Sequence, residues 1–130
     1  KIASPATGNL KVFDMTGDVC ASWLPYSNGN VYIDIPIAGR FSGSTPSGLV
    51  GSLKDVSFER DGTAGRFRVD GTSQITGTVG TSNAAATVNF TLGADVNGFS
   101  PFQGHISSLV VWNTADNADC VARNSALAAT

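Results

Sequence analysis

Residue types that catalyse reactions are sparse in this sequence. Glycoside hydrolysis needs two carboxyl groups that face each other across a cleft, yet the chain has a single glutamate, Glu59, and only Asp34 lies in a strongly alternating segment. His105 is the only histidine, and no Ser-His-Asp arrangement is readable around it. No glycine cluster has the spacing of a phosphate-binding loop. The sequence therefore predicts a protein that is not an enzyme.

Aromatic and amide side chains gather instead in one short stretch. Sugars bind proteins by stacking their CH faces on Trp or Tyr, while amides and carboxylates bond the hydroxyl groups. The candidate ligand-binding residues are Trp23, Tyr26, Asn28, Asn30, Tyr32 and Asp34. A hairpin over residues 23–32 would present Tyr26 and Asn28 in its loop. Tyr32 and Asp34 would be exposed if Val31 and Ile33 face the core, and Trp23 has the alternative of being a core residue.

The balance of charge argues against two classes of partner. Charged residues make up 14% of the 130, and the net charge is −2. Binding to a phosphate backbone needs a clustered basic face, but Arg60, Arg66 and Arg68 are interleaved with acidic residues. No apolar run approaches the roughly 20 residues that span a bilayer. We expect no nucleic-acid binding and no membrane insertion.

Short strand patterns separated by Gly, Ser, Asn and Asp clusters must position these residues. Strands are predicted over Leu10–Met15, Val19–Leu24, Val31–Ile37, Leu53–Arg60, Gly65–Asp70, Gln74–Gly80, Thr87–Leu92 and Ile106–Trp112. Asn28-Gly29 is a turn signal, and Pro36 places its strand at an edge or ends it there. Residues 41–48 show no periodicity and are expected to form a loop, and 115–128 could be helical. The pattern predicts one all-β domain over residues 1–130, an antiparallel β-sandwich or jelly roll.

The cysteines leave two alternatives open. Cys20 and Cys120 are far apart in the sequence, and neither has a nearby histidine or second cysteine, so a metal site or a catalytic thiol is not expected. A disulfide forms if the first and last strands are neighbours. Otherwise the two residues are buried free thiols.

The second half of the chain resembles the concanavalin A-like jelly rolls of the laminin-G type. The similarity lies in three segments: the strand–Asp-Gly-Thr–strand pattern of residues 56–71, the Phe-Thr-Leu-Gly of residues 90–93, and the aromatic-x-Gly-x-Ile strand ending in Trp112-Asn113. It covers roughly Leu53 to Ala122. The first half departs from the family pattern, because no counterpart of a Trp-containing strand precedes the Asp-Gly-Thr hairpin. A reduced sandwich, or a domain completed by another chain, would account for this difference.

The resemblance implies some properties and leaves others out. Some members are glycosidases, but the Glu-x-Asp-x-x-Glu type of motif found in related β-glucanases is absent here. Other members bind calcium through loop carboxylates, which makes Asp95, Asp116 and Asp119 candidates. Turn formation or helix capping is the favoured role for these three residues. We expect no cofactor, with calcium as the open alternative.

Two functions of different classes fit these observations. The first is a carbohydrate-binding, lectin-like module for a cell-surface glycan. The Gly/Ser/Thr/Asn-rich composition of this sequence is similar to that of receptor-binding tips of bacteriophage tail fibres and tailspikes. This similarity implies a location at the virion surface or outside the cell, and a homotrimer. The second is a structural or assembly module without a ligand, in which exposed Phe41, Val50 and Phe99 would form subunit contacts.

Overall fold

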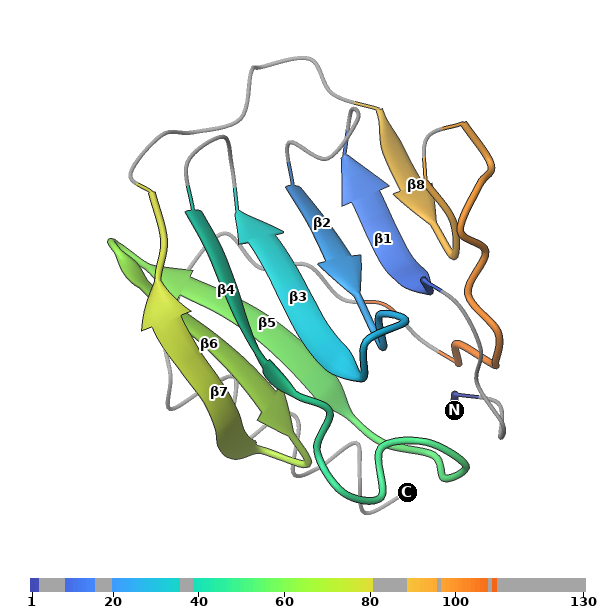
Figure 1. The fold of residues 1–130 in the computed structure, drawn as a ribbon, viewed down its shortest axis with the longest axis horizontal. Helices are drawn as coiled ribbons and strands as arrows, with labels where there is room; N and C mark the ends of the chain where they lie inside the picture. The colour runs from blue at the N-terminus through green and yellow to red at the C-terminus, as the bar shows by residue number, and fades with distance from the viewer. Residues whose placement is uncertain are drawn as a thin grey trace.

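Two antiparallel sheets make up the fold seen in the computed structural model (Figure 1). The structure describes residues 1–2, 9–15, 20–35, 39–80, 89–95, 97–107 and 109, without the side chains of residues 20, 21 and 35. The strands of the larger sheet, in spatial order, are β4 (Gly39–Ser44), β3 (Asn30–Ile35), β2 (Cys20–Trp23), β1 (Lys11–Met15) and β8 (Phe90–Leu92). The smaller sheet has the order β5 (Val56–Asp61), β6 (Ala64–Val69) and β7 (Thr72–Thr78). The predicted all-β sandwich is confirmed.

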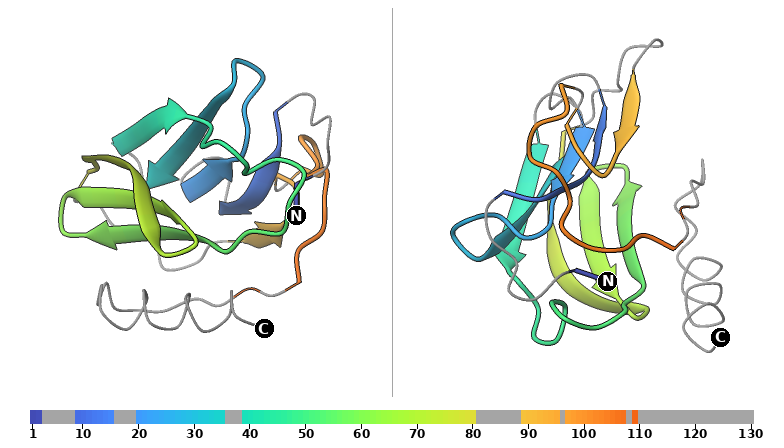
Figure 2. Two further views of the ribbon diagram at one scale, coloured as in Figure 1. Left: turned by 90° about the horizontal axis from the view of Figure 1, so that it is seen from below. Right: turned by 90° about the vertical axis from the view of Figure 1, so that its right-hand side faces the viewer.

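One apolar core lies between the two sheets, which Figure 2 shows as separate layers. Alternate residues of β3 and β6 point inward, so that Val31 and Ile33 of β3 are fully buried and Phe67 of β6 faces them from the other sheet. Aromatic rings extend the contact, because Phe13 of β1 packs edge-on against Phe58 of β5 with 5.6 Å between ring centroids. The outer face of the larger sheet is consequently formed by the polar half of each alternation.

The sheets come closest where β4 packs against β7, and glycines allow this approach. A Cβ on Gly77 would lie 2.3 Å from Cβ of Phe41, and a Cβ on Gly39 would lie 2.2 Å from the backbone nitrogen of Gly80. Gly43 faces the Ile75 side chain in the same way, at 3.0 Å. The inward positions of β4 are therefore Gly39, Phe41 and Gly43, with only one large apolar side chain among them.

The structure corrects three sequence-based expectations for residues 41–50. Residues 41–48 were expected to be a loop, but 41–44 belong to β4, because inward glycines remove the apolar half of the alternation. Phe41 is 4% exposed and belongs to the core, so it is not a subunit contact. Val50 is half-buried against the same core. Phe99, in contrast, is exposed as expected.

The remaining strand predictions agree with the structure at most positions. β3 ends at Ile35, directly before Pro36, and lies inside the sheet rather than at its edge. Of the strand predicted over 106–112, the structure describes Ile106, Ser107 and Leu109, and none of these is in a strand. The possible helix at 115–128, Trp112 and Cys120 lie outside the described residues, so the helix and the disulfide stay predictions. Within the described ranges no helix is long and apolar enough to cross a bilayer.

Candidate functional site

The outer face of the larger sheet collects the residues selected from the sequence. Trp23 of β2 pairs with Tyr32 of β3, which pairs with Ser42 of β4. Residues directly opposite each other in antiparallel strands point to the same face. Because Val31 and Ile33 point into the core, Tyr32 and Asp34 point outward. Trp23 and Ser42 share that face, and the predicted hairpin over residues 23–32 is present.

Three aromatic rings stand in a continuous row on this face. The Tyr26 ring lies 5.4 Å from Trp23 and 5.3 Å from Tyr32 between centroids, with interplanar angles of 88° and 76°. Such edge-to-face contacts stabilise an aromatic cluster beyond the area it buries. All three residues are half-buried, so the row is fixed by its own packing and keeps part of its surface in solvent.

Two amides hold the hydroxyl group of Tyr32. Nδ2 of Asn28 donates to the Tyr32 hydroxyl at 2.7 Å, and Nδ2 of Asn30 donates to it at 3.4 Å. A phenol oxygen has two acceptor positions and one proton, so its O–H remains to act as a donor toward solvent or a ligand. The bonds from Asn28 and then Asn30 lower the pKa of Tyr32 below its ordinary value, and the nearby Arg40 charge contributes in the same direction.

Backbone hydrogen bonds fix the loop that carries Tyr26 and Asn28. The Tyr26 N–H donates to the Asn30 carbonyl, and the Gly29 N–H donates to the Tyr26 carbonyl at 2.9 Å. Gly29 has φ +82°, as the Asn-Gly signal predicts. Thr45, just after β4, donates both its N–H and its hydroxyl to the Gly29 carbonyl. The loop is consequently pre-organised before any ligand arrives.

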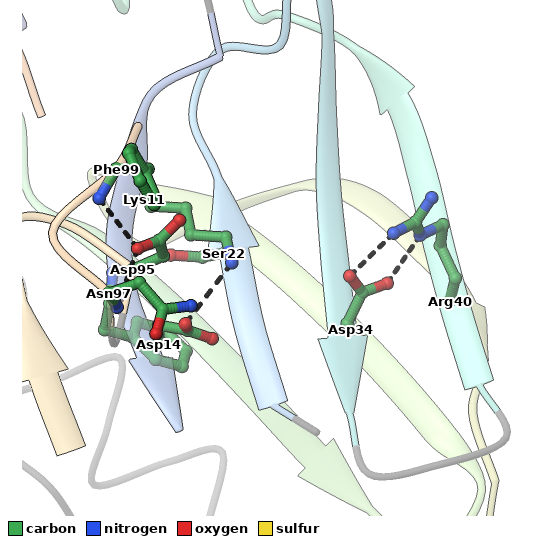
Figure 3. A network of polar contacts seen from close by, with 9 residues as sticks. Lys11, Asp14, Ser22, Asp34, Arg40, Asp95, Asn97 and Phe99 are labelled. Carbon is green, nitrogen blue, oxygen red and sulfur yellow. Dashed lines mark hydrogen bonds and ion pairs between the residues drawn. The ribbon is translucent and has the colours of Figure 1, made fainter. Parts of the chain in front are cut away.

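Asp34 has a different environment from the one expected. It was expected to be exposed, but it is only 8% exposed because Arg40 of β4 pairs with it. Nε and Nη2 of Arg40 lie 2.5 Å and 2.8 Å from the two carboxylate oxygens of Asp34 (Figure 3). The guanidinium carbon also lies 5.1 Å from the Tyr32 ring centroid. Arg40 thus balances the negative charge of Asp34 through a bidentate ion pair, and its guanidinium packs against the Tyr32 ring.

A second pair of charges lies on the same face, beneath a loop. An irregularity in the β1–β2 register between Lys11 and Phe13 allows Lys11 and Asp14 to face the same side, 3.3 Å apart. Both are almost fully buried, and the Lys11 N–H donates to the Ser100 carbonyl of the loop after β8 at 3.1 Å.

The Lys11 ammonium also lies 4.3 Å from the Trp23 ring centroid. One side of the indole ring is thus occupied by this cation, and Nε1 of Trp23 is buried. Trp23 therefore forms one end of the aromatic row and is held in place between the buried Lys11 and the Tyr26 ring.

The other sequence candidates have structural roles where they are described. Oδ1 of Asp95 accepts from the N–H groups of Asn97 and Phe99, which is the turn-forming role favoured for it. Asp116 and Asp119 lie outside the described residues. His105 is exposed, and its N–H donates to the Lys1 carbonyl. Within the part of the chain that the structure describes, no three His, Cys, Asp or Glu residues are grouped to hold a metal ion.

Two site residues were missed from the sequence, Lys11 and Arg40. Arg40 directly precedes the segment that was expected to be a loop, so it was not expected to stand opposite Asp34. The signal was present in the alternation of Arg40, Ser42 and Ser44 with Gly39, Phe41 and Gly43. Lys11 lies in a strand that was predicted, but the irregularity that turns it toward Trp23 leaves no mark in the residue pattern.

Comparison with known proteins adds one finding. Residues 14–122 match a family model described as "Concanavalin A-like lectin/glucanases superfamily". The match begins at Asp14, so it includes the first half of the chain, which sequence reasoning had left outside the resemblance. Searches of curated proteins and of solved structures gave no significant match.

Proposed function

Because this chain belongs to the concanavalin A-like lectin/glucanase superfamily, we propose that it is a carbohydrate-binding recognition module without catalytic activity. Its ligand is a glycan, and its binding site is the outer face of the larger sheet around the β2–β3 hairpin. The observation that carries the proposal is the fixed aromatic row of Trp23, Tyr26 and Tyr32, whose last member keeps its O–H as a donor.

The chemistry of a sugar matches this arrangement. A pyranose ring presents an apolar CH face beside a rim of hydroxyl groups, and a half-exposed tyrosine ring next to polar side chains accommodates both. The Tyr32 hydroxyl donates to a sugar oxygen while the Asn28 amide holds it in place. Because the loop is already fixed by its hydrogen bonds, little conformational entropy is lost on binding.

The six predicted residues divide into two groups in this proposal. Tyr26, Tyr32, Asn28 and Asn30 contact the sugar, because they stand at the hairpin loop and are half-buried or exposed. Trp23 and Asp34 are positioning residues. Trp23 is held between Lys11 and Tyr26, and Asp34 is bound to Arg40.

The lack of catalysis is part of the proposal. A glycosidase needs one carboxyl group that exchanges a proton and a second that acts as nucleophile or base. The two acids that the described strands place on this face, Asp14 and Asp34, each form an ion pair with a neighbouring cation. Both carboxylates therefore stabilise the sheet instead of facing a substrate across a cleft.

The experiment is binding of the fluorescently labelled domain to purified polysaccharides and to bacterial cells. Saturable binding that a specific sugar competes away is the expected result. Tyr32→Ala should weaken it by at least about tenfold, the effect of removing an aromatic contact from a binding site. The matched control is Thr76→Ala, an exposed position on the smaller sheet. Absence of binding to every glycan would reject the proposal, and equal loss in both variants would reject this location of the site.

A second candidate function, an assembly module, is favoured by one observation. Phe99, in the loop after β8, is 70% exposed, and Leu53 is 66% exposed. Such residues fit subunit contacts in a homotrimer, as in a fibre tip that presents the glycan site at a virion surface or outside the cell. Light scattering of the purified chain distinguishes the cases: a trimer that Phe99→Ser dissociates supports assembly, and a monomer at all concentrations argues against it.

A further inference from the structure

The charges of the larger sheet cancel in pairs on its outer face. Its five strands contain four charged residues: Lys11, Asp14, Asp34 and Arg40. Lys11 lies 3.3 Å from Asp14, and Arg40 binds Asp34 through two nitrogens. Each cation also lies over an aromatic ring of the row, at Trp23 for Lys11 and at Tyr32 for Arg40. Among the residues that the structure describes, the charges carried by the strands of this face therefore sum to zero.

Basic residues are concentrated on the other sheet. Arg60, Arg66 and Arg68 belong to β5 and β6, and Lys54 pairs with Asp70 beside them. Nε of Arg68 binds Glu59 at 2.8 Å. If this protein recognised an acidic glycan by charge, an excess of cations over carboxylates would be expected around the aromatic row, where Lys11 and Arg40 instead each have a carboxylate partner.

From this arrangement we infer that the aromatic face selects uncharged saccharides and discriminates against uronic, sialic and sulfated ones. The inference rests on the proposed glycan-binding function and names its ligand class. A carboxylate or sulfate near Tyr32 would meet Arg40 only in competition with Asp34, which already holds it in bidentate geometry. It would also approach the Asp34 carboxylate, a like charge. Hydroxyl groups avoid both costs, because they bond to the phenol and the amides without displacing an ion pair.

The first test compares neutral and anionic oligosaccharides of equal length by calorimetry. The neutral probes are the hexaoses of glucans and mannan, and the anionic probes are hyaluronan, alginate and heparin hexasaccharides. We expect the best ligand to be neutral, and its affinity to change less than about twofold between 50 and 500 mM NaCl, because no ion pair forms on binding. A preference for an anionic probe that is lost in high salt overturns the inference and leaves the glycan-binding function standing. Failure of both sets to bind rejects both.

The second test changes the charge of the face with an isosteric substitution. Asp34→Asn leaves Arg40 without its carboxylate and should raise the affinity for anionic relative to neutral probes by about fivefold, the upper range for a surface ion pair. Glu59→Gln is the matched control, because it changes the net charge by the same amount and removes the partner of Arg68 on the other sheet.

The outcome of the second test is a ratio of affinities within each variant. A small loss of fold stability therefore does not disguise it, and thermal unfolding of both variants verifies that they are folded. A higher ratio in Asp34→Asn alone supports the inference. An unchanged ratio in Asp34→Asn, or an equal rise in Glu59→Gln, contradicts it.

Discussion

The amide nitrogen of Asn28 lies 2.7 Å from the hydroxyl oxygen of Tyr32, across the loop of the β2–β3 hairpin. Through this bond the loop residue orients the strand residue, and the phenol proton is directed away from the amides. Asn28 also accepts the Asn30 N–H through Oδ1 at 3.1 Å. One side chain thus ties the turn, the strand and the proposed sugar-binding hydroxyl together.

Tyr32 should make glycan binding sensitive to alkaline pH. Hydrogen bonds from Asn28 and Asn30 hold its pKa below the ordinary 10.0, and the phenolate form cannot donate to a sugar oxygen. Affinity should therefore fall as the pH rises through this lowered pKa, by about three- to tenfold for one lost hydrogen bond. Tyr32→Phe should bind with that reduced affinity at neutral pH and lose the alkaline decline, as calorimetry at several pH values will measure.

Ionisation of Tyr32 does not unfold the protein, so unfolding at this residue does not explain the alkaline decline in affinity. A lowered folded-state pKa means that the phenolate is favoured in the folded chain. The stability contributed by Tyr32 is therefore present above the unfolded tyrosine pKa of about 10 and lost as the pH falls through the lowered value. Ionisation of Tyr32 thus favours the fold while it removes the donor. A decline of equal size in Tyr32→Phe would show that another group is responsible.

Asn28→Ala should weaken binding because it removes, besides the proposed sugar contact of Asn28, the bond that orients the Tyr32 hydroxyl. The Asn28 bond is the largest cause of the lowered Tyr32 pKa, so its loss should move that pKa back toward 10. Spectrophotometric titration resolves the change, since Tyr26 and Tyr32 are the two tyrosines of the chain. Weaker binding without the pKa change would mean that Asn28 acts on the sugar rather than through Tyr32. Thr76→Ala serves again as the control.

Part of the site could be predicted because it depends on local patterns. The alternation of Val31 and Ile33 with Tyr32 determines which side chains face outward, and the Asn-Gly turn brings Trp23 opposite Tyr32. The environment of Asp34 could not be predicted in this way. Its partner, Arg40, comes from a strand whose inward residues include two glycines, and the hydrophobic period that reveals a strand is lost there.

The close packing of β4 against β7 could not be predicted from the glycine content of the sequence alone. A glycine in a sequence is compatible with a turn and with a close approach of two backbones, and only the packed sheets reveal that Phe41 fills the space over Gly77 and Gly65. The buried pair of Lys11 and Asp14 depends in turn on a register irregularity that no residue type announces. The first contact joins strands that are far apart in the sequence, and the second joins two residues of one strand that a strict alternation would place on opposite faces.

Gly77→Ala should therefore destabilise the domain while the binding face stays intact in the folded fraction. The added Cβ would lie 2.3 Å from Cβ of Phe41, so the β4–β7 edge must separate. The expected cost is about 1–3 kcal/mol, typical of overpacking in a core, measured by urea unfolding. Thr76→Ala, one residue away and exposed, should change stability by less than about 0.5 kcal/mol. Equal stability of both variants would contradict the packing described here.

Replacing Asp55 by asparagine and replacing its neighbour Asp70 by asparagine should change the stability of the fold in opposite directions. Burial, and then the nearby Asp70 charge, raise the pKa of Asp55. The charged form of Asp55 therefore lowers the free energy of unfolding. This loss of stability grows as the pH rises from the pKa of an unfolded aspartate, about 3.9, through the raised pKa of the folded state. Asp55→Asn should raise stability at pH 7 by no more than about 1 kcal/mol, since Asp55 is partly exposed and solvent screens the effect. The gain should vanish below pH 4.

Asp70→Asn is the matched opposite of that change. The bond from Lys54 is the largest cause that lowers the pKa of Asp70, and the Asp55 N–H adds to it. The stability that Asp70 contributes is therefore present above the unfolded pKa and lost as the pH falls through the lowered one. Asparagine tolerates the φ of +49° at this position, so the substitution isolates the charge and should lower stability at pH 7 by about 0.2–1 kcal/mol. Urea unfolding of both variants at pH 3 and pH 7 measures the two effects, and a common sign at pH 7 would refute the assignment of opposite roles to these carboxylates.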